Sequence, residues 1–217
     1  IVRTDIFNQV YEAENDQNNT TASPTALQVV VDELQIGVVE AFDLASGEEK
    51  LFQITVPINQ TTRIRLTSDD KATTNEVFVR YDAAPTSAQF DATYRGVLSS
   101  DPEVLVPSTQ PGIYYILVRG FSGGPRSLEI KAEWLPLVIT GVPTDVGGDS
   151  AFVTTTIEGA QFRDGALVKL VRPGIAEYEP LVWEVIDSTK IIAKFDFTDA
   201  DHGLYDLKVV NPDGTEA

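Results

Sequence analysis

The chain has 217 residues, with 16 basic and 33 acidic side chains, one His, no Cys and no Met. This composition excludes a cysteine nucleophile, a disulfide framework and a zinc cage of Cys or several His residues. The net charge of −17 would repel phosphate backbones and anionic lipids, so we expect no nucleic acid partner and no membrane surface. We also expect no membrane insertion, because no apolar run is long enough to span a bilayer. The apolar content of 42% supports a folded core.

The excess of acidic residues is uneven along the chain. The net charge is −5 over residues 1–35 (1 basic, 6 acidic), −4 over 36–135 (9 and 13) and −8 over 136–217 (6 and 14). We therefore expect two solvated acidic regions around a more balanced middle.

Runs of β-branched and aromatic residues alternate with polar residues and predict strands of β-sandwiches. In the run 61–67, Thr62, Ile64 and Leu66 should share one buried face. The run 26–35 suits a helix or a strand, and its three consecutive valines favour a strand because they are stiff at χ1. The other predicted strands are 51–56, 76–82, 113–120, 127–134, 137–140, 151–159, 166–171, 180–187, 190–196 and 204–210.

A boundary near 134–136 divides these strands into two β-domains. We expect an all-β chain with two β-sandwiches in tandem, the first jelly-roll-like and the second immunoglobulin-like. The expected divisions are an N-terminal strand or linker segment at 1–34, a first sandwich at 35–135 and a second at 136–217.

A Gly-apolar-Tyr pattern opens a late strand in each half, at 112–118 and 203–209. A Tyr in this position predicts a tyrosine corner, in which the phenol hydroxyl bonds nearby backbone. Tyr114 and Tyr205 should fill these positions.

The second half resembles an immunoglobulin-like domain of the IPT/TIG family over about residues 137–217. The resemblance depends on four turn and strand positions, which are Pro143, Gly147 with Gly148, Thr154 to Ile157 with Gly159 and Phe162, and Asn211 to Gly214. The family's last strand should follow the Asn-Pro-Asp-Gly turn and is missing. Together with a start at Ile1 and no Met, this leads us to expect a fragment of a multidomain protein.

The first half resembles a bacterial pre-peptidase C-terminal domain, a sandwich of jelly-roll type. The resembling segments are the acidic opening 12–16, the Gly-acidic turn and strand 46–57, and the Gly-x-Tyr-Tyr strand 111–120. In an alternative interpretation, 4–21 resembles the closing strand of a bacterial cell-adhesion-related domain, and 1–22 is the tail of a preceding domain. Both resemblances imply a large secreted or cell-surface bacterial protein.

Calcium is the metal that the acidic opening suits. Ca²⁺ takes six to eight oxygen ligands, and the pre-peptidase resemblance implies Glu12, Glu14, Asn15 and Asp16 as ligands. The family's partnering acidic pair is replaced here by 45–49, with Asp43, Glu48 or Glu49 as substitutes. The alternative interpretation is a solvated polar linker that holds no cofactor.

Other candidate sites are better explained by structure. His202, the one His, precedes Gly203 in a predicted turn, and no pair among the acidic residues stands out as catalytic. The stretch 196–203 and the pair Asp69–Asp70 suit turns with surface acids. The aromatic residues that could stack on sugars, but suit core or linker packing better, are Trp134, Trp183, Tyr81, Tyr94 and Tyr178.

We therefore expect a non-catalytic structural or adhesion module, extracellular or at the cell surface. Its expected partners are neighbouring domains of the same polypeptide, and an extracellular protein or polysaccharide. The alternatives are an accessory carbohydrate- or protein-binding module of a secreted hydrolase, and an enzyme whose carboxylates the sequence does not single out.

Overall fold

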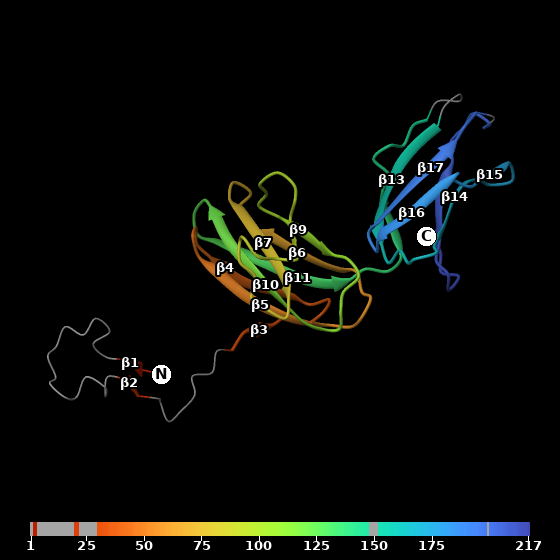
Figure 1. Ribbon diagram of the computed structural model, residues 1–217. Helices are drawn as coiled ribbons and strands as arrows, with labels where there is room; N and C mark the ends of the chain where they lie inside the picture. The colour runs from red at the N-terminus through yellow and green to blue at the C-terminus, as the bar shows by residue number, and fades with distance from the viewer. Residues whose placement is uncertain (1, 4–19, 22–29, 148–151, 199) are drawn as a thin grey trace, which may run out of the picture. The chain divides into compact units, whose positions relative to one another are not determined.

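The computed structural model describes residues 2–3, 20–21, 30–147, 152–198 and 200–217 (Figure 1). The chain divides into two compact units, Ile1–Val31 and Asp32–Ala217. In the first unit, β1 (Val2–Arg3) pairs antiparallel with β2 (Thr20–Thr21). The described residues form strands and turns without any helix, so none of them forms a helix that could cross a membrane. The expected all-β class with tandem β-sandwiches is confirmed.

The first sandwich has two facing sheets, with strand orders β3-β5-β10-β7-β8 and β4-β11-β6-β9. Its strands are β3 (Asp32–Glu33), β4 (Val39–Leu44), β5 (Glu49–Val56), β6 (Thr62–Ser68), β7 (Thr74–Tyr81), β8 (Ala92–Thr93), β9 (Glu103–Val106), β10 (Gly112–Ser122) and β11 (Arg126–Trp134). All neighbours run antiparallel except β3, which runs parallel to β5.

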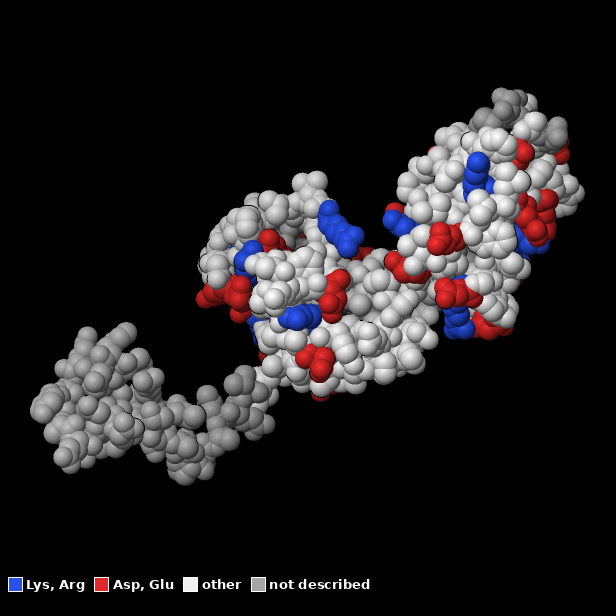
Figure 2. Space-filling model, in the orientation of Figure 1, with Lys and Arg blue, Asp and Glu red and all other residues white. Residues whose placement is uncertain are grey.

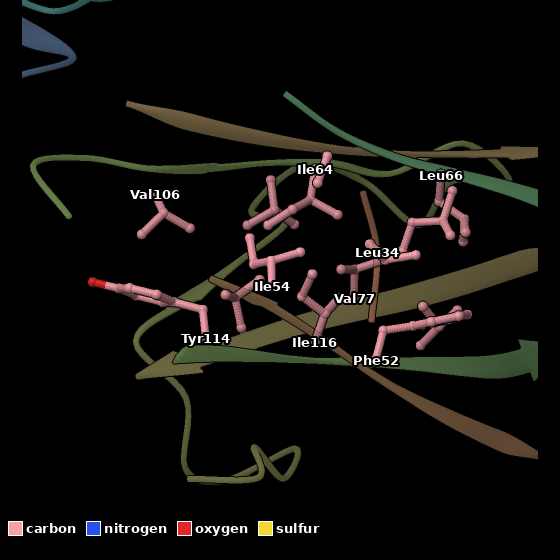
Figure 3. Close-up of a cluster of buried hydrophobic side chains, with 14 of the residues drawn as sticks. Leu34, Phe52, Ile54, Ile64, Leu66, Val77, Val106, Tyr114 and Ile116 are labelled. Carbon is pink, nitrogen blue, oxygen red and sulfur yellow. The ribbon is translucent and has the colours of Figure 1, made fainter. Parts of the chain in front are cut away.

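The core of this sandwich follows the two-residue period of its strands. Thr62, Ile64 and Leu66 of β6 are buried as expected, and the two arginines between them lie on the outer face. In Figure 3, Ile64 and Leu66 extend toward Phe52 and Ile116 of the opposite sheet. Burying a side chain of this size contributes roughly 1.5–3 kcal/mol, so this cluster is the main source of the sandwich's stability.

The second sandwich is also made of two sheets, with strand orders β12-β13-β17-β16 and β15-β14-β18. Its strands are β12 (Val138–Gly141), β13 (Phe152–Ala160), β14 (Leu167–Arg172), β15 (Ala176–Tyr178), β16 (Val182–Asp187), β17 (Lys190–Asp196) and β18 (Asp206–Val210). Gly159 is required by close packing, because a Cβ there would lie 2.4 Å from the ring of Phe162 and 2.2 Å from the Val138 carbonyl oxygen.

Some strands differ from the sequence expectation. The strand β4 was not predicted, and neither were the short strands β8, β9 and β15. The predicted strand 180–187 begins later, as β16 at Val182, and Leu181 before it is 59% exposed. Only Asp32–Glu33 of the ambiguous run 26–35 is a described strand, and residues 26–29 lie outside the described part of the chain.

Charged side chains of both signs lie next to each other over both sandwiches on the face shown in Figure 2. In the first sandwich, ion pairs form across neighbouring strands, such as Arg63 with Glu133 and Arg65 with Glu103. The surface on this face is therefore mixed in sign although the chain as a whole is acidic.

Candidate functional site

Two buried hydroxyl groups link the first and the second sandwich. Thr61 directly precedes β6, and Ser188 lies in the turn between β16 and β17. Their hydroxyl oxygens are 2.8 Å apart, and each also accepts a hydrogen bond from a backbone amide. Thr61 Oγ1 accepts from Gln161 N–H at 3.1 Å, and Ser188 Oγ accepts from Ser108 N–H at 2.9 Å. We call these four residues the junction network.

The junction network also coincides with backbone strain. Among the described residues, four that are not glycine have a positive φ, and three of them are at this junction: Asn59 (59°), Ser108 (44°) and Gln161 (60°). Such conformations cost about 1–3 kcal/mol each, so they persist where surrounding contacts hold them. The hydrogen bonds of the junction network supply such contacts.

The side chain of Gln161 adds to this link. Its hydrogen-bond surroundings orient the amide nitrogen toward the Asn59 carbonyl oxygen (3.3 Å) and the amide oxygen toward Thr61 N–H (3.0 Å). The Leu135 amide, in the connection between the sandwiches, donates to the Thr61 carbonyl at 2.9 Å. Thr61 is therefore bonded through its amide, its carbonyl and its hydroxyl, and the junction joins the two sandwiches by more than the covalent connection.

The residues proposed to bind calcium, Glu12, Glu14, Asn15 and Asp16, lie outside the described residues. The suggested partner acids are described, and two of them serve local structure. Asp43 accepts a hydrogen bond from Ser127 Oγ at 2.6 Å, and Glu48 accepts one from Ala45 N–H at 2.8 Å. The calcium site stays a prediction.

The described residues of the acidic stretch 196–203 form the end of β17 and the turn and bend that follow it. Asp196 Oδ1 accepts hydrogen bonds from the hydroxyl (2.6 Å) and the amide (3.0 Å) of Thr198, which form an Asx turn and lower the pKa of Asp196 below its ordinary value. Asp201 donates its amide to Tyr178 Oη at 3.1 Å, while Asp199 is outside the described residues. Over the described part of the chain, no three His, Cys, Asp or Glu side chains are grouped to hold a metal.

The carboxylates of Asp69 and Asp70 also bond backbone amides. Asp70 Oδ1 accepts from Ala72 N–H at 2.9 Å, and Asp69 Oδ1 accepts from Ser127 N–H at 3.0 Å. The Asp70 carboxylate therefore closes a turn, as the sequence suggested, whereas the Asp69 carboxylate joins the end of β6 to the start of β11.

His202 lies in an exposed bend before Gly203, where the sequence placed a turn. Its backbone carbonyl accepts a hydrogen bond from Arg172 Nη1 at 2.9 Å. This contact ties the bend to β14 and is structural in character.

Most of the candidate sugar-stacking aromatics pack or bond inside the fold. Trp183 packs against the second core and donates its indole N–H to the Ala166 carbonyl at 2.7 Å. Tyr81 and Tyr94 pack against the first core, and Tyr178 stacks edge-on against Tyr205. Trp134, at the end of β11, is 41% exposed.

A different aromatic group lies on the outer face of the first sandwich and was not identified from the sequence. The guanidinium of Arg119 is 5.9 Å from the ring centres of both Phe78 and Phe121, and Phe90 lies 5.4 Å from Phe78. Phe90 and Phe121 are exposed. The sequence signal for this group is that Phe121 lies two residues after Arg119 on β10, because residues two apart on a strand share a face.

Both tyrosine corners are confirmed. Tyr114 Oη accepts from Gln110 N–H at 2.9 Å, and Tyr205 Oη donates to the Asp201 carbonyl at 2.7 Å, each four residues upstream. Burial raises the pKa of Tyr114 above its ordinary value of 10.0. The neutral phenol therefore suits its place in the folded core.

No family model and no curated protein matches this sequence. Among solved structures, the chain is similar to the pre-peptidase C-terminal domain of a collagenase from Bacillus anthracis, with 12% identity and a TM-score of 0.41 over 50% of this chain and 99% of that one. It is also similar to PliG of Aeromonas hydrophila, a periplasmic inhibitor of g-type lysozyme, with 12% identity and a TM-score of 0.35 over 47% and 95%. Both similarities are weak, and neither assigns a family or a function. The resemblances of the second half to an IPT/TIG domain and of the N-terminal segment to a cell-adhesion-related domain stay predictions.

Proposed function

We propose that this chain is a non-catalytic structural or adhesion module of a large secreted or cell-surface bacterial protein. In this proposal, the three expected divisions at 1–34, 35–135 and 136–217 are consecutive modules, and the two sandwiches act as one rigid spacer. The observation that supports it is the buried bond between Thr61 and Ser188. A flexible tether between domains would need no buried hydroxyl pair at its ends.

A rigid spacer fixes the relative orientation of the parts that it separates, as well as the distance between them. Buried polar groups lose stability when one partner is removed, because the other is left without a hydrogen bond. Bending at the junction would separate Thr61 from Ser188 and Gln161 from its backbone partners. The junction network thus favours one relative orientation of the sandwiches.

Spin labels can test this proposal directly, because the chain has no native Cys. Exposed Ser87 and Glu184, one on each sandwich, are replaced by labelled Cys, and the distance distribution is measured by pulsed electron paramagnetic resonance. We expect one narrow distribution that broadens when Ser188 is replaced by Ala. A broad distribution in the parent chain would overturn the rigid spacer, and reproducible turnover on a peptide or glycan panel would overturn the non-catalytic role.

The alternative role, an accessory carbohydrate- or protein-binding module, is favoured by the aromatic group on the outer face of the first sandwich. Exposed Phe121 lies beside Arg119, and exposed Phe90 lies beside Phe78, the other ring that Arg119 contacts. A cation beside aromatic rings is a common feature of binding surfaces. Pull-down on insoluble polysaccharides and collagen tests it, with Phe121→Ala as the variant. Binding that this substitution abolishes would favour the accessory role over the spacer.

A further inference from the structure

The sequence contains two Asp-Gly pairs, Asp164–Gly165 and Asp213–Gly214. An Asp before Gly is prone to spontaneous rearrangement, because glycine has no Cβ to hinder attack by its amide nitrogen on the carboxyl carbon of the preceding side chain. Both pairs lie in turns of the second sandwich, and both glycines have a positive φ, of 81° and 83°. The hydrogen bonds of the two pairs, however, are different.

The first pair has both reacting groups open to solvent. Asp164 and Gly165 are the central residues of a turn that the Ala166 amide closes by donating to the Arg163 carbonyl at 2.9 Å. This closure uses neither the Asp164 carboxylate nor the Gly165 N–H, and both residues are exposed. Among the described residues, none forms a hydrogen bond or ion pair with either group. The side chain and the amide of this pair are therefore available to each other.

The second pair is held at both reacting groups. The Gly214 N–H donates to the Asn211 carbonyl at 2.9 Å. The Asp213 carboxylate accepts from the hydroxyl (2.6 Å) and the amide (3.0 Å) of Thr215 and from Arg163 Nη1 (2.5 Å). These contacts, the Thr215 hydroxyl first, lower the pKa of Asp213 below its ordinary value and keep the group ionised. A carboxylate loses an oxygen less readily than a carboxylic acid, so this pair is protected.

From this contrast, we infer that Asp164 is a site of spontaneous isomerisation to isoaspartate and that Asp213 is protected from it. In the first step, the Gly165 nitrogen bonds to Cγ of Asp164, and the carboxyl OH leaves with the amide proton as water, which closes a succinimide ring. In the second step, water adds to the main-chain carbonyl carbon of Asp164, and the bond from this carbon to the Gly165 nitrogen breaks. The main chain then runs through Cγ, and the former main-chain carbonyl becomes a free carboxylate. Water is the only co-reactant, and no group is oxidised or reduced.

Isomerisation lengthens the main chain of this turn by one methylene group, between flanking residues that are fixed. Phe162 and Ala166, on either side of the turn, are buried. The Phe162 amide donates to the Ser188 carbonyl at 3.0 Å, and the Ala166 carbonyl accepts from the Trp183 indole N–H at 2.7 Å. A closely packed interior cannot absorb the extra atom without displacing such contacts. Isoaspartate at position 164 should therefore destabilise the second sandwich.

Peptide mapping of the whole chain, after weeks of incubation at neutral pH and body temperature, tests this inference. Incubation in H₂¹⁸O labels each succinimide that opens, and electron-transfer dissociation distinguishes isoaspartate from aspartate at a single residue. We expect isoaspartate to accumulate at least about tenfold faster at Asp164 than at Asp213, because the second pair must first break its hydrogen bonds. In concentrated urea, where neither turn persists, the two pairs should react at similar rates.

Asp164→Glu is the matched control, because it keeps the charge but would have to close a larger and less favourable ring. This variant should form no isomer at position 164 and should keep its melting temperature through the incubation. The isoaspartate form of the parent chain, separated by chromatography, should melt at a lower temperature than the unmodified chain incubated with it. The inference is overturned if isoaspartate does not accumulate at Asp164 in the folded chain, or if Asp213 reacts equally fast there. It is also overturned if the isoaspartate form melts at the same temperature as the unmodified chain.

Discussion

Thr61 Oγ1 and Ser188 Oγ are 2.8 Å apart in a buried contact between residues that are 127 positions apart in the sequence. Each hydroxyl also accepts a backbone amide hydrogen bond, so neither oxygen depends on water. The contact therefore joins Thr61 and Ser108 of the first sandwich to Gln161 and Ser188 of the second.

Ser188→Ala should destabilise the chain by about 1–3 kcal/mol, because it leaves the Ser108 amide and the Thr61 hydroxyl without their buried partner. Urea unfolding followed by Trp fluorescence measures the loss. In a double-mutant cycle with Thr61→Val, we expect a coupling of about 0.5–3 kcal/mol. Exposed Ser87→Ala is the matched control and should change stability by less than about 0.5 kcal/mol. Strictly additive effects would mean that the two hydroxyls do not interact.

Removing the hydroxyl of Thr62, the residue after Thr61, should not destabilise the chain. Thr62 is also buried, but its Oγ1 has no hydrogen-bond partner among the described residues. A buried hydroxyl without a partner costs about 1–3 kcal/mol. Thr62→Val keeps the shape of the side chain and should leave stability unchanged or raise it by about 1 kcal/mol. The same urea experiment checks it, and a loss above 1 kcal/mol would show that the hydroxyl is satisfied in solution.

The parts of the fold that followed from the sequence are those with strict alternation. β6 was predicted with its buried face because polar residues separate Thr62, Ile64 and Leu66. β4 was not predicted, because only Phe42 and Leu44 of its six residues are buried. A strand with so few apolar contacts has too weak a period to stand out from a loop.

The candidate sites followed less well from the sequence. The turn role of Asp196 could be predicted because its partner Thr198 is two residues away. The bond between Thr61 and Ser188 could not, because each residue alone is an ordinary turn residue and their proximity depends on how two sandwiches pack. Pairings between distant segments leave no local pattern in a single sequence.

The hydrogen bonds of the two tyrosine corners should contribute different amounts to the free energy of unfolding. Tyr114→Phe removes a hydrogen bond inside the buried core and should cost about 0.5–1.5 kcal/mol. Tyr205→Phe removes a more exposed bond, and we expect a smaller loss. Thermal unfolding of the two variants compares them. Equal losses would mean that burial of the phenol does not set the strength of the corner.

Tyr114 should also make the fold sensitive to alkali. Because burial raises its pKa in the folded state above the ordinary value of 10.0, its contribution to stability is complete below that value. It is lost as the pH rises through the folded-state pKa. Stability measured between pH 9 and 12 should therefore fall less steeply in Tyr114→Phe than in the parent chain. Parallel curves for the two proteins would contradict this.

Glu133 should contribute to loss of stability in acid. Hydrogen bonds from Lys131 and Arg63 lower its pKa below the ordinary value of 4.5. A lowered pKa stabilises the fold above the unfolded-state value, and this contribution is lost as the pH falls through the folded-state pKa. Glu133→Gln should cost about 0.5–1 kcal/mol at pH 7. The difference from the parent should vanish toward pH 2.

The control for this experiment is Glu129→Gln, an exposed position on the same strand that has the same charge change. It should follow the parent curve closely from pH 2 to 7. If both substitutions reduce the loss of stability between pH 7 and pH 2 equally, net charge would explain the effect, and the contacts of Glu133 with Lys131 and Arg63 would not.

Calcium binding by Glu12, Glu14, Asn15 and Asp16 is the remaining prediction from the sequence. If these residues hold Ca²⁺, binding to the native state must stabilise it, and we expect a modest rise in melting temperature with millimolar Ca²⁺. The rise should disappear in Glu14→Gln combined with Asp16→Asn. It should persist in Asp69→Asn, because the Asp69 carboxylate bonds the Ser127 amide within the first sandwich. Calorimetry with Ca²⁺ and with a chelator measures both. An unchanged transition in the parent chain would identify this segment as a solvated polar linker, because a bound cation cannot leave the unfolding equilibrium unaffected.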